Sequence, residues 1–373
     1  MTTTLVLPGR PAPRVLVLVP DASGCAAYRA FQPVAELQRQ GAPVGAVEWG
    51  WHTDADLEKI FLAFDAVVLA RLRWDAPYRE FGRRWVSALH AAGLFVWYEV
   101  DDDLFSPWIV RQQLRGGILP DESPAVKEQH RRSRIDALQL CDGVTVTSQR
   151  LATVVRQYTD APVEVVPNAL DWRWFKAVLA LAGPRTVPPL TVGWAGGARP
   201  DADVEPMAWA WGQLAQRHPE VTFVVQGHQP RPVYEQVPPH RLRAIDWLPL
   251  EAYPLGLREV DVACCPLADA PFNRCKTPIK AWEAAACGAA VVASPTIYGQ
   301  TITHGEDGYL CATKEDWLGA LERLVADAAE RRRLARNLRR RVAAEHSLEG
   351  NAWRWPAAWS RLAERERAGG WVA

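Results

Sequence analysis

Short apolar runs alternate with longer amphipathic stretches along the chain. Continuous apolar runs of this kind are typical of parallel strands that are covered on both faces. Amphipathic stretches follow them, one running to about Gln40 and another at 79–92, and predict helices. Strands that alternate with helices indicate a doubly wound α/β domain. In the first half the strand-like runs lie at residues 14–20, 66–70, 94–100, 143–147 and 163–167.

The alternation stops after Asn168 and starts again at residue 190. The irregular stretch between them has three prolines near its end and is interpreted as an interdomain linker at 169–189. We therefore expect two Rossmann-like domains, residues 1–168 and residues 190–350. In the second domain, strands are expected at 190–194, 221–225, 260–264 and 289–293, and helices at 317–328 and 330–344.

The last segment, residues 351–373, carries four tryptophans. Most of them follow helical spacing, which indicates packing anchors rather than a ligand platform. We expect a helical tail that packs back toward the first domain. The tryptophans are Trp353, Trp355, Trp359 and Trp371.

Composition narrows the function classes. The 373 residues have a formal net charge of zero, so there is no global basic field for nucleic acid or an anionic membrane. The seven cysteines have no C-x-x-C spacing, which favours reduced thiols in a cytoplasmic protein over disulfides or a zinc site. The N-terminus lacks the signature of a signal peptide. No apolar run approaches the ~20 residues of a membrane span.

The most unusual stretch is PFNRCKTPIKAWEAAACG, residues 271–288. It predicts a loop that turns into a helix, with Thr277 as the N-cap, Pro278 in the first helical position and Gly288 at the end. A helix N-terminus carries partial positive charge and favours acidic residues nearby. Arg274, Lys276 and Lys280 stand there instead.

This basic helix start has two interpretations. Backbone N–H groups with basic side chains can bind a phosphate or diphosphate, for which Arg274, Lys276, Thr277 and Lys280 are candidates. Alternatively, the stretch is a solvated basic turn in which Lys280 pairs with Glu283 three residues on, worth a few tenths of a kcal/mol.

Other candidates follow predicted strands, where open α/β sheets bind ligands. Gly24 follows the first strand, and the loop Ala195-Gly196-Gly197-Ala198-Arg199 follows the strand that opens the second domain. Asp101, Asp102 and Asp103 follow the strand at 94–100. These carboxylates would suit a hard cation such as Mg²⁺, or they form a solvated acidic loop.

Several motifs together resemble a known family. Residues 141–148, CDGVTVTS, and 166–171, VPNALD, are similar to a paired passage of the "group 1" retaining glycosyltransferases. Residues 191–197, TVGWAGG, resemble the loop that opens the family's donor domain. The family's signature resembles WEAAACGAAVVAS at 282–294 and HGEDGYL at 304–310. The resemblance covers nearly the whole chain and implies the GT-B architecture, two Rossmann-like domains that face each other across a cleft.

The resemblance implies a role for each candidate. The first domain would bind the acceptor and the second a nucleotide-diphosphate sugar, most simply a UDP- or GDP-sugar, without another cofactor. Glu283 matches the glutamate that binds the donor ribose, and Asp102-Asp103 replaces a His-Asp pair near the transferred sugar. Lys276 would act with these aspartates in catalysis. No metal is implied, because basic side chains and a helix N-terminus meet the phosphate charge.

The resemblance also implies residues around the donor and acceptor. The diphosphate is expected near Gly24, Gly196, Gly197 and Arg199 in addition to the basic stretch. The vicinity of the donor sugar and acceptor is expected to contain Tyr28, Arg29, Asn273, Cys275 and Tyr298. Cys275 departs from the family, where a first glutamate is common, and so does Gln300.

Four function classes stay open on the sequence. The leading one is an enzyme that transfers a sugar to an unidentified acceptor, with retention. A sugar-nucleotide epimerase of the same architecture would need an acid–base pair, for which Asp102, Asp103 and His304 are available. A degenerate, non-catalytic sugar-nucleotide-binding module is suggested by Cys275 and Gln300. A nucleic-acid-modifying glycosyltransferase of phage type would need a local basic groove.

Overall fold

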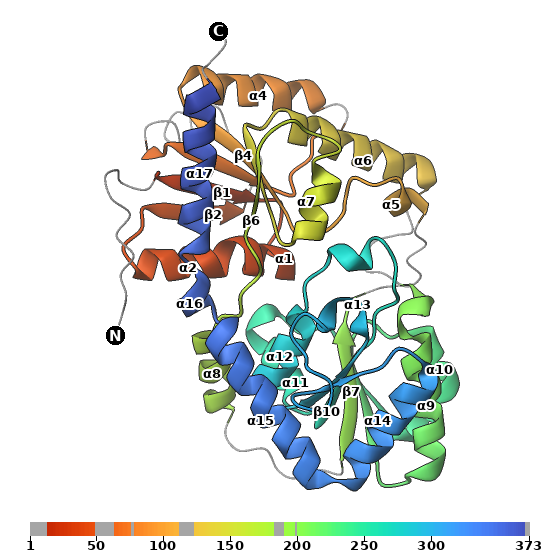
Figure 1. Cartoon of the computed structure of the whole chain (residues 1–373). Coiled ribbons are helices and arrows are strands. Elements are labelled where there is room, and N and C mark those ends of the chain that lie inside the picture. Colours follow the sequence, from red (N-terminus) through yellow and green to blue (C-terminus); the bar gives the residue numbers. More distant parts are fainter. Residues whose placement is uncertain are drawn as a thin grey trace. The chain divides into compact units, whose positions relative to one another are not determined.

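A computed structural model describes residues 13–48, 63–75, 78–111, 123–182, 190–197 and 200–369 of the chain. The chain divides into two compact units, residues 1–101, 132–166 and 352–373, and residues 102–131 and 167–351. Each unit contains a six-stranded parallel sheet with helices packed on it (Figure 1). The predicted fold class, two doubly wound α/β domains, is confirmed.

The sheet of the first unit is built from valine-rich strands. Two of its central strands, β1 and β3, are buried at every position, which explains their continuous apolar sequences. The strand order is β2-β1-β3-β4-β5-β6, and all pairs are parallel. The strands are β1 Val15–Val19, β2 Val44–Glu48, β3 Ala66–Ala70, β4 Phe95–Val100, β5 Gly143–Val146 and β6 Val163–Val165.

Helices of the first unit come from both ends of the chain. The C-terminal helix α17, Arg354–Gly369, packs on β6 (Figure 1). It also lies close to β5, because a Cβ added at Gly143 would lie 2.8 Å from Leu362. The tail residue Trp371 lies outside the described residues. The other helices are α1 Gly24–Ala26, the π-helical turn Ala27–Phe31, α2 Gln32–Arg39, α4 Arg79–Ala91, α6 Pro124–Gln139 and α7 Gln149–Val155. Helix α6 crosses the boundary between the units at residues 131 and 132.

The second unit repeats the same design. Its parallel sheet has the order β12-β11-β10-β7-β8-β9. All strands of one parallel sheet end at the same edge, so the loops after β7, β8, β10 and β11 gather there. The strands are β7 Thr191–Gly196, β8 Thr222–Gly227, β9 Leu242–Ile245, β10 Val262–Cys265, β11 Ala290–Ala293 and β12 Tyr309–Leu310.

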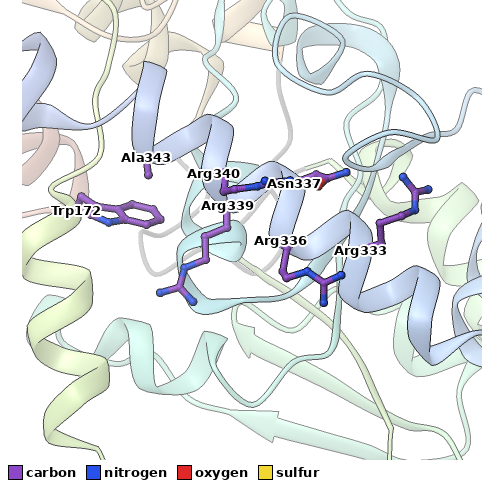
Figure 2. Close-up of a pocket in the computed structure, with 7 residues that line it drawn as sticks. All are labelled: Trp172, Arg333, Arg336, Asn337, Arg339, Arg340 and Ala343. Atoms are coloured by element: carbon purple, nitrogen blue, oxygen red, sulfur yellow. Dashed lines mark hydrogen bonds between the residues drawn. The ribbon is translucent and has the colours of Figure 1, made fainter.

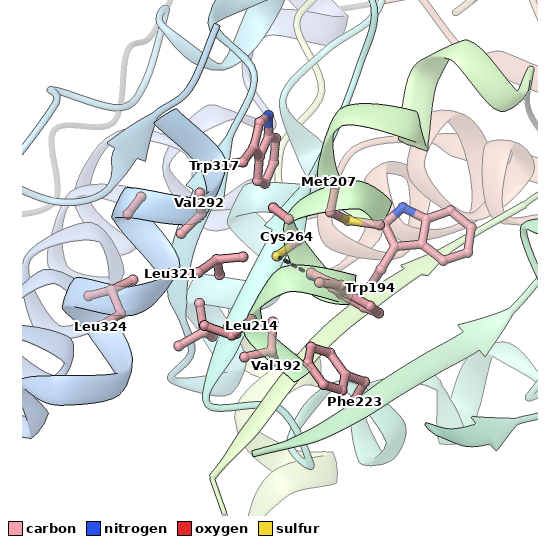
Figure 3. Packing of buried hydrophobic residues seen from close by; sticks show 14 of the residues in the cluster. Val192, Trp194, Met207, Leu214, Phe223, Cys264, Val292, Trp317, Leu321 and Leu324 are labelled. Carbon is pink, nitrogen blue, oxygen red and sulfur yellow. Dashed lines mark hydrogen bonds between the residues drawn. The ribbon is translucent and has the colours of Figure 1, made fainter. Parts of the chain in front are cut away.

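The core of the second unit is dense in tryptophan (Figure 3). Trp211 and Phe223 lie with ring centres 5.1 Å apart, and the indole N–H of Trp211 donates to the Cys264 sulfur at 3.4 Å. Trp317 and Leu321 from a neighbouring helix are part of the same cluster. A hydrogen-bond partner for the buried indole nitrogen lowers the desolvation cost of placing so large a ring in the core.

The helices of the second unit surround this core. Thr313 caps α14 through a capping box with Asp316, which moves the helix start three residues ahead of the predicted Trp317. The helices are α5 Trp108–Arg111, α8 Trp172–Leu181, α9 Asp201–Arg217, α10 Arg231–Gln236, α11 Tyr253–Leu257, α12 Ile279–Cys287, α13 Pro295–Tyr298, α14 Lys314–Ala326, α15 Ala328–Glu345 and α16 Leu348–Asn351.

Three sequence predictions differ from the fold. The segment predicted as an irregular linker contains α8, whose N-cap Asp171 accepts a hydrogen bond from the backbone N–H of Trp174 at 2.9 Å. The linker prolines lie outside the described residues. Strands β2 and β9 were not predicted, because both are partly exposed and lack a continuous apolar run. Strand β12 was not predicted either, because it has only two residues.

Candidate functional site

The start of α12 is a helix N-terminus, which carries partial positive charge. The helix begins at Ile279 with Pro278 as N-cap, no side chain caps it, and no acidic residue stands in its first turn. The predicted N-cap Thr277 is therefore wrong. Its hydroxyl instead accepts a hydrogen bond from Asn168 Nδ2 at 2.8 Å. The first backbone N–H groups of α12 keep their capacity to bind an anion.

Lys276 stands immediately before this helix. Its Nζ lies 3.0 Å from Asp102 Oδ1 and 4.4 Å from the ring centre of Phe272. The ring of Trp108 stacks on Phe272 with centres 4.8 Å apart, which fixes the aromatic surface under the ammonium group. Both charged side chains of the pair are partly exposed, 27% for the lysine and 20% for the aspartate. Lys276 is thus held in place while its ammonium group stays accessible.

Lys280 stands one turn further along α12, in a hydrogen-bonded triad. Its Nζ lies 2.8 Å from the hydroxyl of Tyr253 and 3.1 Å from Glu283 Oε2. The tyrosine hydroxyl donates to the same carboxylate oxygen at 2.9 Å. Glu283 is buried, so its charge is compensated by these neighbours. The i,i+3 pair expected under the alternative interpretation is present, and the triad also fixes the carboxylate for a polar ligand.

The loop before α12 is shaped by buried polar side chains. Asn273 donates to Asp203 Oδ1 at 2.7 Å and to the backbone oxygen of Ala268 at 3.0 Å. Cys275 is fully buried. These two residues, predicted to lie near the donor sugar, have side chains that face the interior and position the loop.

Arg274 has a partner within the same loop. Its guanidinium donates to both carboxylate oxygens of Asp269, at 2.6 and 2.7 Å. The hydrogen bonds raise the pKa of Arg274 and lower that of Asp269. Because both side chains are exposed, a ligand phosphate could replace the carboxylate at little cost.

The three consecutive aspartates serve three different partners. Asp101 accepts from Arg71 at 2.7 Å, Asp102 pairs with Lys276, and Asp103 accepts backbone N–H bonds from Phe105 and Ser106 at 3.2 and 2.9 Å. Asp103 is buried and caps its own loop. Among the described residues no three His, Cys, Asp or Glu side chains gather as a metal site. Of the triplet, Asp102 is therefore the carboxylate directed at the basic loop.

The glycine loop after β7 meets an exposed aromatic ring. A Cβ at Gly196 would lie 2.7 Å from Trp194, and one at Gly197 would lie 3.6 Å from Trp247. Trp247 is 59% exposed, unusual for so large a ring at this edge of a sheet. Sequence reasoning missed Trp247 and Tyr253, although both follow strand β9. Arg199 lies outside the described residues.

The remaining predicted residues are mostly buried. Tyr28 and Tyr298 are 9% and 3% exposed. Gly24 begins α1, and a Cβ there would meet nothing within 4 Å. Arg29 donates to Glu99 and to the backbone oxygen of Val166, both at 2.8 Å. Burial raises the pKa of Glu99, and the charge of Arg29 opposes that shift. Arg29 therefore stabilises a buried carboxylate inside the first unit.

Comparison with known proteins bears on the fold and on one segment of the chain. Residues 189–327 match the sequence profile of the family described as "Glycosyl transferases group 1". No curated protein matches the chain by sequence. The solved structures that resemble it share its fold at low identity.

Three solved structures illustrate the likeness. Sucrose-phosphate synthase from Thermosynechococcus elongatus is 17% identical, with 94% of this chain and 99% of that chain covered and a TM-score of 0.63. HepE from Anabaena, in complex with UDP-glucose, is 14% identical, with 95% and 100% covered and a TM-score of 0.60. The pneumococcal O-GlcNAc transferase GtfA, in complex with UDP and GlcNAc, is 11% identical, with 83% and 59% covered and a TM-score of 0.55.

These findings concern the fold and one segment of the chain. The chain has the GT-B fold. Residues 189–327, in its second unit, match the group 1 glycosyl transferases, so the resemblance noted in the sequence is confirmed over that segment. No described helix is long and apolar enough to cross a membrane.

Because Asp102 and Asp103 have different partners, we expect their variants to lose different amounts of stability. Asp103→Ala removes a buried acceptor of two backbone N–H groups and should lower the free energy of unfolding by about 1.5–3 kcal/mol. Asp102→Asn loosens a partly exposed ion pair and should cost less than about 1 kcal/mol. Urea unfolding followed by circular dichroism measures both. Equal losses in the two variants would contradict the separate roles.

Proposed function

We propose that the protein transfers a sugar from a nucleotide-diphosphate sugar, with the donor diphosphate at the start of α12. The observation that carries the proposal is the placement of Lys276 and Lys280 at an uncapped helix N-terminus, within the segment that matches the glycosyltransferase family. Backbone N–H groups and two ammonium groups together suit a diphosphate. UDP is the first nucleotide to test, because two of the similar structures contain UDP or UDP-glucose.

The second unit offers a surface for each part of such a donor. Glu283, held by Tyr253 and Lys280, can accept hydrogen bonds from the ribose hydroxyls. Trp247 offers an exposed face on which the base can stack. Asp102 lies within reach of Lys276 and can accept a bond from a sugar or acceptor hydroxyl. Arg274 can add a third cation at the phosphates once it leaves Asp269.

The chemistry then requires no side chain as nucleophile. Negative charge grows on the diphosphate as the bond to the sugar breaks, and Lys276 and Lys280 stabilise that charge. We propose transfer with retention, in which the acceptor attacks from the side of the departing diphosphate and the diphosphate takes the proton. The same cations make a metal ion unnecessary.

All seven cysteines are free thiols, which supports a cytoplasmic location.

The binding role of the two lysines can be measured directly. Lys276→Ala and Lys280→Ala should each weaken UDP binding by about 1.5–3 kcal/mol, roughly 10- to 150-fold in Kd, because each removes a charge-assisted bond. Isothermal titration calorimetry gives the affinities.

Lys314→Ala is the matched control. Lys314 also begins a helix, α14, but Glu315 and Asp316 share its first turn. This variant should bind UDP like the wild type. Unchanged affinity in both Lys276→Ala and Lys280→Ala would remove the diphosphate from this site.

Metal dependence separates the proposal from a metal-assisted transfer. With the phosphate charge met by side chains and a helix N-terminus, sugar release from UDP-glucose should survive EDTA. Asp102→Asn should cut turnover while leaving the affinity for UDP alone nearly intact. Turnover is followed as UDP production. Activity that EDTA abolishes and Mn²⁺ restores would overturn both the role of Asp102 and the metal-free mechanism.

A further inference from the structure

A recess on the second unit is lined by none of the residues proposed for the donor (Figure 2). Its volume is about 630 Å³, within the range of small-molecule sites. One wall is Trp172, the first residue of α8, and the other is a face of α15. The residues of α15 that line it are Arg333, Arg336, Asn337, Arg339, Arg340 and Ala343.

The charge on this helix is strongly unbalanced. Helix α15 has the sequence AAERRRLARNLRRRVAAE, with arginines far outnumbering its two glutamates. Two of the arginines have acidic partners, Arg333 with Glu330 at 2.8 Å and Arg341 with Asp307 at 3.0 Å. Within the described part of the chain, Arg336 and Arg339 are exposed and have no carboxylate within 4 Å. Like charges one turn apart repel each other, so the helix loses stability unless an anion lies among them.

The side chains of the recess are also held in place. The guanidinium of Arg339 lies 5.7 Å from the ring centre of Trp172, a cation–π distance. Arg340 donates to Asn337 Oδ1 at 2.6 Å. Planar guanidinium groups that are fixed by neighbours lose little entropy when they bind an oxyanion through two bonds.

The neighbouring recess limits where an anion can bind. It shares Asn337 and Arg340 but is lined by Glu306 and Asp307 as well, and its volume is about 430 Å³. Two carboxylates there repel a phosphate. The attractive region therefore runs from Arg333 to Arg340 beside Trp172, about two turns of helix.

We propose that this recess binds a small soluble anion with two or more phosphate groups. A guanidinium group binds phosphate oxygens through two parallel hydrogen bonds. The volume suits a small molecule. The formal net charge of zero gives no wider field for a nucleic acid or an anionic membrane. The inference is independent of the proposed glycosyl transfer, since it uses none of the donor-site residues.

The test uses inorganic tripolyphosphate and the full-length chain in the Lys276→Ala/Lys280→Ala background, so that binding at α12 does not contribute. Calorimetry should show one binding event. Adding Arg336→Gln and Arg339→Gln should weaken it by about tenfold for each arginine removed. The control adds Arg83→Gln and Arg84→Gln, two exposed arginines of α4, and removes the same charge. It should bind within twofold of the background.

Four outcomes contradict the proposal. One is the absence of tripolyphosphate binding in the background protein. Another is an equal loss in the two double-arginine variants, which would mean unspecific attraction. The third is binding only to phosphatidylglycerol vesicles or to a DNA duplex. An Arg336→Lys/Arg339→Lys variant keeps the charge and is expected to fall between the wild-type recess and the glutamine variant. Wild-type affinity in that lysine variant would contradict recognition by guanidinium groups.

Discussion

Two lysines at the start of a helix that has no acidic residue in its first turn impose the constraint on which the site depends. The N-terminus of α12 is electropositive, and Lys276 and Lys280 add charge of the same sign. Each ammonium group has a carboxylate partner, Asp102 or Glu283, that lowers the repulsion. Both lysine side chains are partly exposed, 27% for Lys276 and 31% for Lys280. Each ammonium group also lies over an aromatic ring, at 4.4 Å from the centre of Phe272 and 4.8 Å from that of Tyr253. A diphosphate would complete the charge balance that these pairs begin.

The surrounding fold makes this arrangement rigid. Asp203, near the start of α9, receives bonds from Asn273 and from the backbone of Ala268, so the basic loop is tied to a neighbouring helix. The second sheet brings the glycine loop after β7 and the exposed Trp247 to the edge where its parallel strands end. The tryptophan-rich core of this unit includes none of the residues proposed for the donor. The core and the proposed site thus use different residues of the same unit.

Local sequence signals could predict much of this. Continuous apolar runs locate the buried strands, and residues 66–70 were predicted with the bounds of β3. The basic stretch and Glu283 stand out by composition alone. Roles that depend on distant partners could not be predicted. The interior positions of Asn273 and Cys275 are set by Asp203 and by packing, and Arg29 is fixed by Glu99, seventy positions away. The adjacent Asp101, Asp102 and Asp103 look equivalent in sequence, yet each faces a different partner. Helix α8 was missed because its strongly apolar, tryptophan-rich sequence lies next to a proline cluster that indicated a linker.

The central claim is that the start of α12 binds a nucleoside diphosphate. Thermal unfolding with UDP, GDP, ADP, CDP or TDP tests it most directly, with the matching monophosphates as comparison. A ligand at 100 times its Kd stabilises the folded state by about 2.7 kcal/mol, enough to raise the Tm by several degrees. The account predicts that at least one diphosphate, UDP first, raises the Tm more than its monophosphate does. If no diphosphate raises the Tm above that of the free protein, the helix start is a solvated basic turn and the account is wrong.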